Sequence, residues 1–289
     1  MLQLFTDSDT DIQPQVAAQY GYKMISMPYS VDGTTTFPYE DFEVFDCHAF
    51  YEMLRDGVLP TTSALSEEKY IEYFEPDFAA GNDILYVHFS AAMTVTFDVM
   101  HKAVDRLLEK YPDRRFYEVD TKGITTISYL IVREIGELYK QGKSAEEILA
   151  WAKDEVDHFA MYFFADDLKF FKRSGRVSGL AAMMGTLVGV RPIIFMSAEG
   201  KMESIGTERG RFKAMNRLLD EVDKLKLDLS SHRLAVGHTD APELAEEMAD
   251  LLRERFGEDL VIDIVPTNPT AGSHCGPNGV GVTFHAIHR

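Results

Sequence analysis

The sequence predicts an α/β protein built from two domains, and three observations lead to this fold class. The chain has 289 residues, and a single hydrophobic core rarely grows that large. Its first half alternates strand-like and helix-like segments, which predicts a doubly wound, three-layer domain with a parallel sheet. Its second half places a hairpin among further strands and helices, which predicts a smaller two-layer domain with a mixed sheet. We therefore expect domains at residues 1–160 and 161–289.

The strands of the first half are short apolar runs that end in polar turns. The clearest run, Asp83–Phe89 (DILYVHF), is almost continuously apolar, which is typical of a buried parallel strand. The other strands are expected at residues 1–5, 22–31 and 116–119. Ligands of such sheets bind at the carboxyl ends of the strands. The turns at 6–9 and 90–94 are therefore the first places to look for a site.

The helices of the first half are predicted from apolar residues that recur with helical spacing. They are expected at residues 41–55, 66–78, 94–111 and 123–140. Ser66 stands at the N-cap position of the second helix. Ser144 and Glu147 form a capping-box pattern that begins a further helix, which extends to about residue 158.

The second half shows the same signals in a different arrangement. Strands are expected at residues 161–165, 190–196, 201–208, 233–236, 260–265 and 279–287, and helices at 179–189, 212–225 and 242–256. The turn Ser197–Gly200 joins two of these strands into a hairpin. The last helix begins at Pro242 and stops at Gly257, as the preferences of helix termini predict.

Composition and charge argue against some classes of function. A net charge of −18 repels phosphodiester backbones, so we expect no nucleic-acid partner. No apolar run approaches the ~20 residues of a membrane span, and the N-terminus lacks a signal-peptide pattern. We expect a cytoplasmic monomer without stable membrane insertion.

No metal or cofactor is expected. Cys47 and Cys275 are too few for a cysteine zinc site, and we expect both to be reduced. Asp7, Asp9 and Asp11 alternate as in a calcium loop, but the Gly and Glu that such a loop requires do not follow. We expect a solvated turn there.

The segment TAGSHCGPNGVGVTFH (270–285) is the strongest local candidate for a binding site. We expect a glycine-rich loop with free backbone N–H groups around His274, whose ring nitrogens can donate or accept hydrogen bonds. The hydroxyls of Thr61, Thr62 and Ser63, just before a helix N-terminus, could bind an anion. Ser90 and Thr94 follow a buried strand, where they serve either as helix caps or as donors.

A second interpretation is a hydrolase or transferase that uses Ser90 or Ser273 with His274. No GxSxG pattern is present, and no acidic residue is placed to orient His274. Hydroxyls with one histidine fit carboxylate binding at least as well. Both interpretations stay open on the residues alone.

Several segments, taken in order, resemble the DegV family. They are TDSDTD near the start, PTTSALS, VHFSAAMTVTF, GRVSGLAA with VRPII, the pair Gly237-His238, and SHCGPNGVGV. The resemblance extends over essentially the whole chain. It implies a non-catalytic protein of two α/β domains that buries one long-chain fatty acid in an apolar tunnel and holds the carboxylate between the domains. It also implies a partner, a fatty acid kinase that converts the presented carboxylate into acyl-phosphate for phospholipid synthesis. A lipid-sensing regulator is a further alternative.

The resemblance also implies which residues hold the carboxylate. Thr62 matches the Thr of the family's TSQPS-like stretch, and Ser90 and Thr94 match the first and third Ser of its SSGLSGTY-like stretch. His274 and the glycines after it match the family's C-terminal motif.

The backbone N–H groups around Ala271 and Gly272 are expected to complete the carboxylate site. Arg176, within GRVS, is expected to support the loop, approach the head group or face a kinase. The chain departs from the family at Ala64 and Leu65, in place of Gln and Pro, and at Ala91 and Ala92, in place of Ser and Gly.

Overall fold

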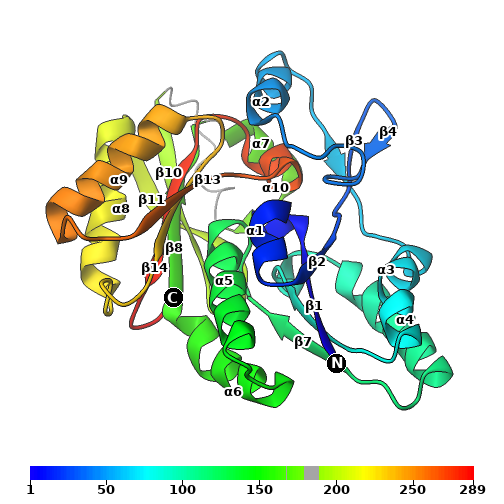
Figure 1. Ribbon diagram of the computed structural model, residues 1–289. Coiled ribbons are helices and arrows are strands. Elements are labelled where there is room, and N and C mark those ends of the chain that lie inside the picture. The colour runs from blue at the N-terminus through cyan, green and yellow to red at the C-terminus, as the bar shows by residue number, and fades with distance from the viewer. Residues whose placement is uncertain (167, 179–188) are drawn as a thin grey trace.

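The computed structural model packs a mixed sheet beside a parallel sheet that carries helices on both faces (Figure 1). The structure describes residues 1–166, 168–178 and 189–289. The helix expected at 179–189 therefore falls almost wholly outside the described residues. Within the described ranges, no helix is long and apolar enough to cross a membrane.

The parallel sheet has the strand order β2-β1-β6-β7. Its strands are β1 (Leu2–Asp7), β2 (Tyr22–Ile25), β6 (Asp83–His88) and β7 (Phe116–Asp120). The chain adds β2 on one side of β1 and then crosses to β6 on the other side. This reversal opens a crevice at the carboxyl ends of β1 and β6, where doubly wound sheets bind their ligands.

Helices cover both faces of the parallel sheet, so the predicted three-layer arrangement is confirmed (Figure 1). One face carries α3 (Glu67–Ala79) and α4 (Thr96–Lys110), and the other carries α1 (Pro14–Gln19), α5 (Thr126–Lys140) and α6 (Ala145–Glu155). Short 3-10 turns are η1 (Ser8–Thr10), η2 (Ala91–Met93) and η3 (Val156–His158). The expected caps are present: Ser66 Oγ accepts from the Lys69 N–H, and Ser144 and Glu147 form the capping box.

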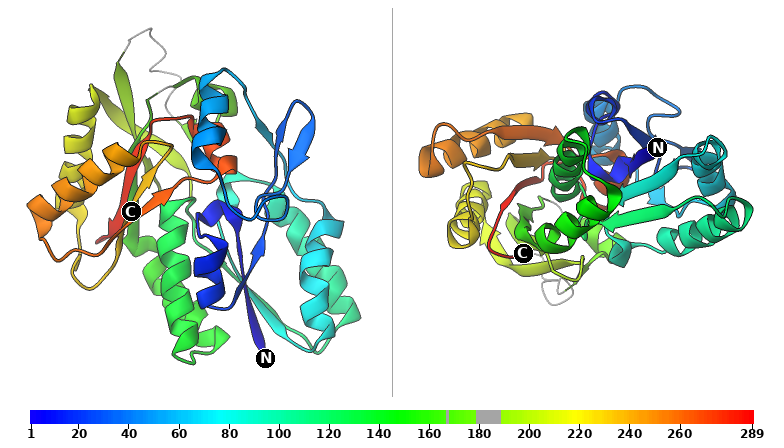
Figure 2. Two further views of the ribbon diagram at one scale, coloured as in Figure 1. Left: turned by 45° about the horizontal axis from the view of Figure 1, so that its top comes forward. Right: turned by 60° about the horizontal axis from the view of Figure 1, so that its bottom comes forward.

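The mixed sheet has the strand order β13-β12-β14-β8-β10-β11-β9. Its strands are β8 (Phe159–Phe164), β9 (Val177–Ser178), β10 (Val190–Met196), β11 (Met202–Arg209), β12 (Leu234–His238), β13 (Ile262–Pro266) and β14 (Val280–His285). The helices α8 (Arg211–Leu225) and α9 (Pro242–Phe256) cover its outer face. Helix α5 packs against its inner face and so lies between the two sheets (Figure 2).

A small antiparallel sheet was not foreseen. It consists of β3 (Tyr29–Val31), β4 (Thr34–Thr36) and β5 (Thr61–Thr62). Asp32 and Gly33 turn between the first two strands with φ of 49° and 82°. An Asp-Gly pair between β-like residues is a strong hairpin signal. Beyond this sheet, α2 (Cys47–Arg55) begins later than expected because Asp46 caps it.

The segment around His274 is also different from the prediction. Residues Pro269–Cys275 form a helix, α10, rather than a loop. Asn268 caps it, Pro269 occupies its first turn, and Gly276 ends it with φ of 73°. An Asn-Pro start and a glycine stop are helix signals. A Cβ at position 276 would also lie 2.2 Å from the ring of Phe170 in α7 (Leu168–Ser174).

Candidate functional site

A cavity of about 500 Å³ lies at the carboxyl ends of β1 and β6, facing β5, α10 and β11. This size is within the range of small-molecule sites. Its wall contains Thr62 from β5, Thr94 from the turn after β6, and His274 from α10. The structure therefore brings together three residues that the sequence singled out far apart.

Thr62 and His274 are in direct contact. Thr62 Oγ1 lies 2.9 Å from His274 Nε2. Strand β5 places Thr62 by pairing it with Tyr29 of β3, and His274 is in the last turn of α10. His274 Nδ1 is buried and has no hydrogen-bond partner in the part of the chain that the structure describes.

The electrostatics of the cavity keep this histidine neutral. Burial, together with the positive charges of Arg176 and Arg173, lowers the pKa of His274 to about 4. A neutral imidazole carries one N–H and one acceptor nitrogen. If Nδ1 holds the proton, Nε2 accepts from Thr62 and Nδ1–H is free. If Nε2 holds it, the Thr62 O–H is free. Because Nδ1 is buried, the donor that the pair offers to a ligand is the Thr62 hydroxyl of the second tautomer.

Two arginines lie next to this pair. The guanidinium of Arg173 donates to the carbonyls of Leu59 (2.8 Å) and Pro60, just before β5, and to that of Ser273 (3.3 Å) in α10. It thereby holds the backbone of both site elements, a role that sequence reasoning missed because it depends on three distant carbonyls. Arg176 is exposed and contributes to the cavity wall, where it is the one positively charged residue among the described lining residues.

Ser90 is buried outside the cavity wall, whereas Thr94 lines the cavity. Ser90 is fully buried, and its Oγ donates to the Gly200 carbonyl (2.7 Å) and accepts from the Ala92 N–H (3.2 Å). Its hydroxyl therefore caps a turn and holds the β10–β11 hairpin. Thr94 lines the cavity, with Oγ1 accepting from the Thr96 N–H at 3.1 Å. No acceptor for its O–H proton is found among the described residues, so this donor is open to a ligand.

The expectation that the backbone around Ala271 and Gly272 supplies free donors is wrong. The Ala271 N–H donates to Asn268 Oδ1 (2.9 Å), and the Gly272 N–H donates to the Asn268 carbonyl (2.8 Å). Both groups are used by the start of α10. Ala271 is part of the cavity wall, whereas Gly272 faces α2, where an added Cβ would lie 2.4 Å from the Tyr51 hydroxyl.

The three aspartates expected in a solvated turn are instead buried. Asp7, Asp9 and Asp11 are 0%, 3% and 3% exposed. Burial raises the pKa of Asp7 and of Asp11 to about 7 against the hydrogen bonds that lower it. Asp11 Oδ1 accepts from both nitrogens of Asn268, at 2.8 Å (N) and 2.7 Å (Nδ2), so η1 is tied to the start of α10.

Neither serine of the hydrolase interpretation contacts His274 through its hydroxyl. Ser273 is fully buried, and its Oγ donates to the Pro269 carbonyl at 2.8 Å. Ser90 Oγ donates to Gly200, as described above. Among the described residues, the hydrogen-bond partner of the imidazole is a threonine, and this arrangement does not activate a serine nucleophile.

A second, apolar cavity adjoins the first, between the start of α5 and the mixed sheet. Ile124, Met202 and Cys275 line both. The second cavity continues along β8 and β14, past Met161 and Val280. Burial raises the pKa of Cys275 to about 12, so its side chain stays an uncharged thiol. The path from the Thr62–His274 pair therefore leads into apolar surroundings.

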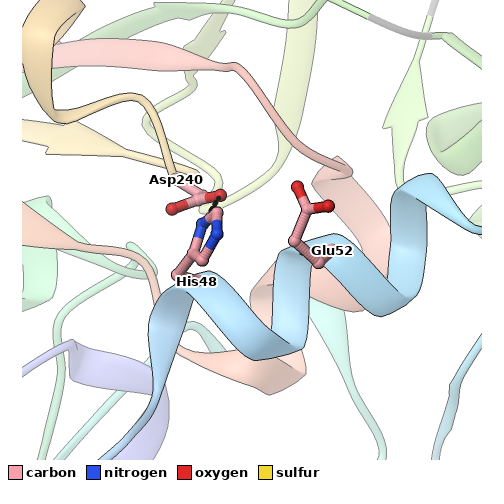
Figure 3. Close-up of side chains that lie close together, drawn as sticks. All are labelled: His48, Glu52 and Asp240. Carbon is pink, nitrogen blue, oxygen red and sulfur yellow. Dashed lines mark hydrogen bonds and ion pairs between the residues drawn. The ribbon is translucent and has the colours of Figure 1, made fainter.

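One acidic cluster lies outside the cavity. His48 and Glu52, one turn apart on α2, point toward Asp240 after β12 (Figure 3). Arg55 already bridges the two carboxylates, with Nη1 2.6 Å from Glu52 Oε1 and 2.5 Å from Asp240 Oδ2. Its Nη2 also donates to Asn278 Oδ1 (2.9 Å). We interpret the cluster as an ion-pair network that fastens α2 to the C-terminal half of the chain.

Comparisons with known proteins agree with the fold. A family model described as "Uncharacterised protein, DegV family" matches residues 1–286. The DegV domain-containing protein CPE0026 of Clostridium perfringens is 31% identical over 282 residues, which cover 97% of this chain and 96% of that protein. A stearic acid-binding protein from Eubacterium ventriosum has a TM-score of 0.85 at 20% identity, covering 98% and 97% of the two chains. A fatty acid-binding DegV family protein from Thermus thermophilus has a TM-score of 0.84 at 21% identity, covering 99% of each.

Proposed function

Because this chain belongs to the DegV family, we propose that it binds one long-chain fatty acid in the cavity, with the carboxylate beside Thr62 and His274. The observation that carries the proposal is the 2.9 Å contact between these two residues at the entrance to an apolar cavity. Structures with the same fold are described as binding fatty acids.

The head-group site has the chemistry that a carboxylate needs. A buried anion must be satisfied by several donors. The Thr62–His274 pair supplies one donor and the Thr94 hydroxyl another, while Arg176 adds a positive charge at the wall. Ser90, Ala271 and Gly272 have their donors engaged elsewhere and are not part of this proposal.

The tail site supplies the affinity. An acyl chain gains about 0.8 kcal/mol for each buried CH₂ group. Ile124, Met202 and Cys275 lie where the tail would pass from the first cavity into the second. Methionine adapts its shape readily, so a narrow apolar path can open around a bound chain.

We further propose that the protein is a monomeric, cytoplasmic accessory that presents the carboxylate to a fatty acid kinase. Transfer of the γ-phosphoryl group of ATP to a carboxylate oxygen gives acyl-phosphate and ADP. The wall residue Val95 is 66% exposed, beside Thr94 and near the exposed Arg176. These residues form an accessible rim on which a kinase would have to dock.

Mass spectrometry of the purified protein tests the binding proposal. Native spectra, followed by solvent extraction, should show one fatty acid per chain. The delipidated protein should take up added palmitate in the same ratio. A protein that is purified without a ligand and also fails to bind palmitate would overturn the proposal.

Addition of a fatty acid kinase and ATP to the loaded protein tests the kinase proposal and should yield acyl-phosphate. Binding without turnover would instead favour a lipid-sensing protein.

A further inference from the structure

Asp9 is a buried acid in the wall of the ligand cavity that the proposed function does not use. It follows β1 in the turn η1 and is 3% exposed. Its Oδ1 has no hydrogen-bond partner in residues 1–166, 168–178 and 189–289. A buried polar atom without a partner costs free energy. A ligand group that bonds to Asp9 recovers that cost, and a plain methylene group does not.

The surroundings of Asp9 disfavour the charged form of its carboxyl group. Burial raises its pKa well above the usual value, and the nearby Asp7 and Asp11 raise it further. A protonated carboxyl group has one O–H donor and keeps an acceptor oxygen. Its best partner is a group that also donates and accepts, and an alcohol hydroxyl has this property.

The position of Asp9 relative to His274 sets where such a hydroxyl would lie. The Asp9 carboxyl and the Thr270 side chain are neighbours in the cavity wall. Thr270 and His274 are four residues apart on α10, and both line the cavity. One helical turn rises about 5.4 Å, and an extended chain advances about 1.2 Å per bond. An acyl chain that starts at His274 and runs along α10 toward Thr270 would therefore bring its first few carbons to Asp9.

We infer that the preferred ligand is a long-chain fatty acid with a hydroxyl group on one of its first few carbons, as in a β-hydroxy acid, and that Asp9 selects it. This inference rests on the proposed function, because the carboxylate is placed by Thr62 and His274. The Thr270 hydroxyl does not compete for the ligand as a donor, since it donates to the Met27 carbonyl at 2.9 Å. Asp9 is thus a specificity residue, and the reaction that supplies the ligand must deliver a hydroxylated acyl chain.

Binding of three ligands tests the inference: palmitate, β-hydroxypalmitate and ω-hydroxypalmitate. The wild-type protein should bind β-hydroxypalmitate about tenfold more tightly than the other two. Asp9→Asn keeps a donor and an acceptor, so it should keep the preference. Asp9→Leu has a similar shape without either, so it should abolish or reverse the preference while still binding palmitate.

The outcomes separate this inference from the proposed function. Equal affinity of the wild-type protein for palmitate and β-hydroxypalmitate overturns the role of Asp9 and leaves fatty-acid binding intact. Loss of the preference in Asp9→Asn as well as in Asp9→Leu also overturns it. If no fatty acid binds to the wild-type protein, the proposed function itself fails. If Asp9→Leu does not fold, the wild-type preference and Asp9→Asn still decide the question.

Discussion

Thr62 Oγ1 and His274 Nε2 lie 2.9 Å apart, although 212 residues separate them in the chain. The contact joins a short edge strand of the first half to a helix of the second half, so it forms only when both halves are folded and docked. Its neutral imidazole leaves one hydrogen-bond donor for a ligand. The site is therefore a property of the tertiary structure rather than of either motif.

The hydroxyl of Thr62 is expected to contribute directly to carboxylate binding. Thr62→Val removes the hydroxyl at almost constant shape and should weaken palmitate binding about tenfold, which corresponds to about 1.4 kcal/mol. Thr61→Val is the matched control, since Thr61 is the exposed neighbour on the same strand. Isothermal titration of both variants checks this. Equal losses in the two variants, or no loss in either, would contradict the assignment of Thr62.

The neutral state of His274 predicts a pH-dependent stability. Its pKa is about 4 in the folded protein and about 6.5 in a free histidine. The unfolded chain therefore takes up a proton first, and stability is lost as the pH falls from about 6.5 to about 4. A glutamine at position 274 does not titrate. The free energy of unfolding of the wild-type protein should therefore fall by up to about 3 kcal/mol relative to that of His274→Gln across this pH range. Urea unfolding of the ligand-free proteins at several pH values measures the difference, and parallel curves would argue against a buried neutral imidazole.

The raised pKa of Asp11 predicts that stability falls as the pH rises, which is opposite to the dependence predicted for His274. Its pKa is raised to about 7 in the folded protein from 3.8, so its contribution to stability is complete below pH 4. That contribution is lost as the pH rises through 7. Asp11→Asn does not titrate, keeps an acceptor for Asn268, and suits the φ of 56° at this position. Between pH 4 and 7, the free energy of unfolding of the variant should rise relative to that of the wild-type protein by up to about 4 kcal/mol. A constant difference across that range would show that Asp11 is ionised.

Sequence reasoning predicted the elements with strong local signals. The caps at Ser66 and Ser144, the buried strand β6 and the helix between Pro242 and Gly257 are all where they were expected. These signals depend on a few neighbouring residues, and tertiary packing does not override them here. The pairing of Thr62 with His274 came from a family resemblance, because no local pattern reports a contact over such a separation.

The structural features that were not predicted correctly from the sequence have two causes. Some local signals are present in the sequence but were not recognised. Asp32-Gly33 forms a hairpin turn, and Asn268-Pro269 starts a helix, ended by Gly276, where a loop was expected. Other features depend on long-range burial. Alternating aspartates in a turn look solvated, and only the packing of η1 against α5 and α10 removes Asp9 and Asp11 from water. The clamp made by Arg173 on three carbonyls is of the same kind.

Arg173 is expected to act as a positioning residue for the pair. Its guanidinium spans the carbonyls of Leu59, Pro60 and Ser273, which a lysine ammonium cannot do with one compact charge. Arg173→Lys should therefore lower palmitate affinity about fivefold by loosening β5 relative to α10, at a cost of about 1 kcal/mol in unfolding free energy. Arg106→Lys, at an exposed ion pair with Glu67 on α4 and α3, is the matched control and should leave affinity unchanged. Retained affinity in Arg173→Lys would mean that Thr62 and His274 hold their geometry without the clamp, because β5 pairing and the cap of α10 would then be sufficient.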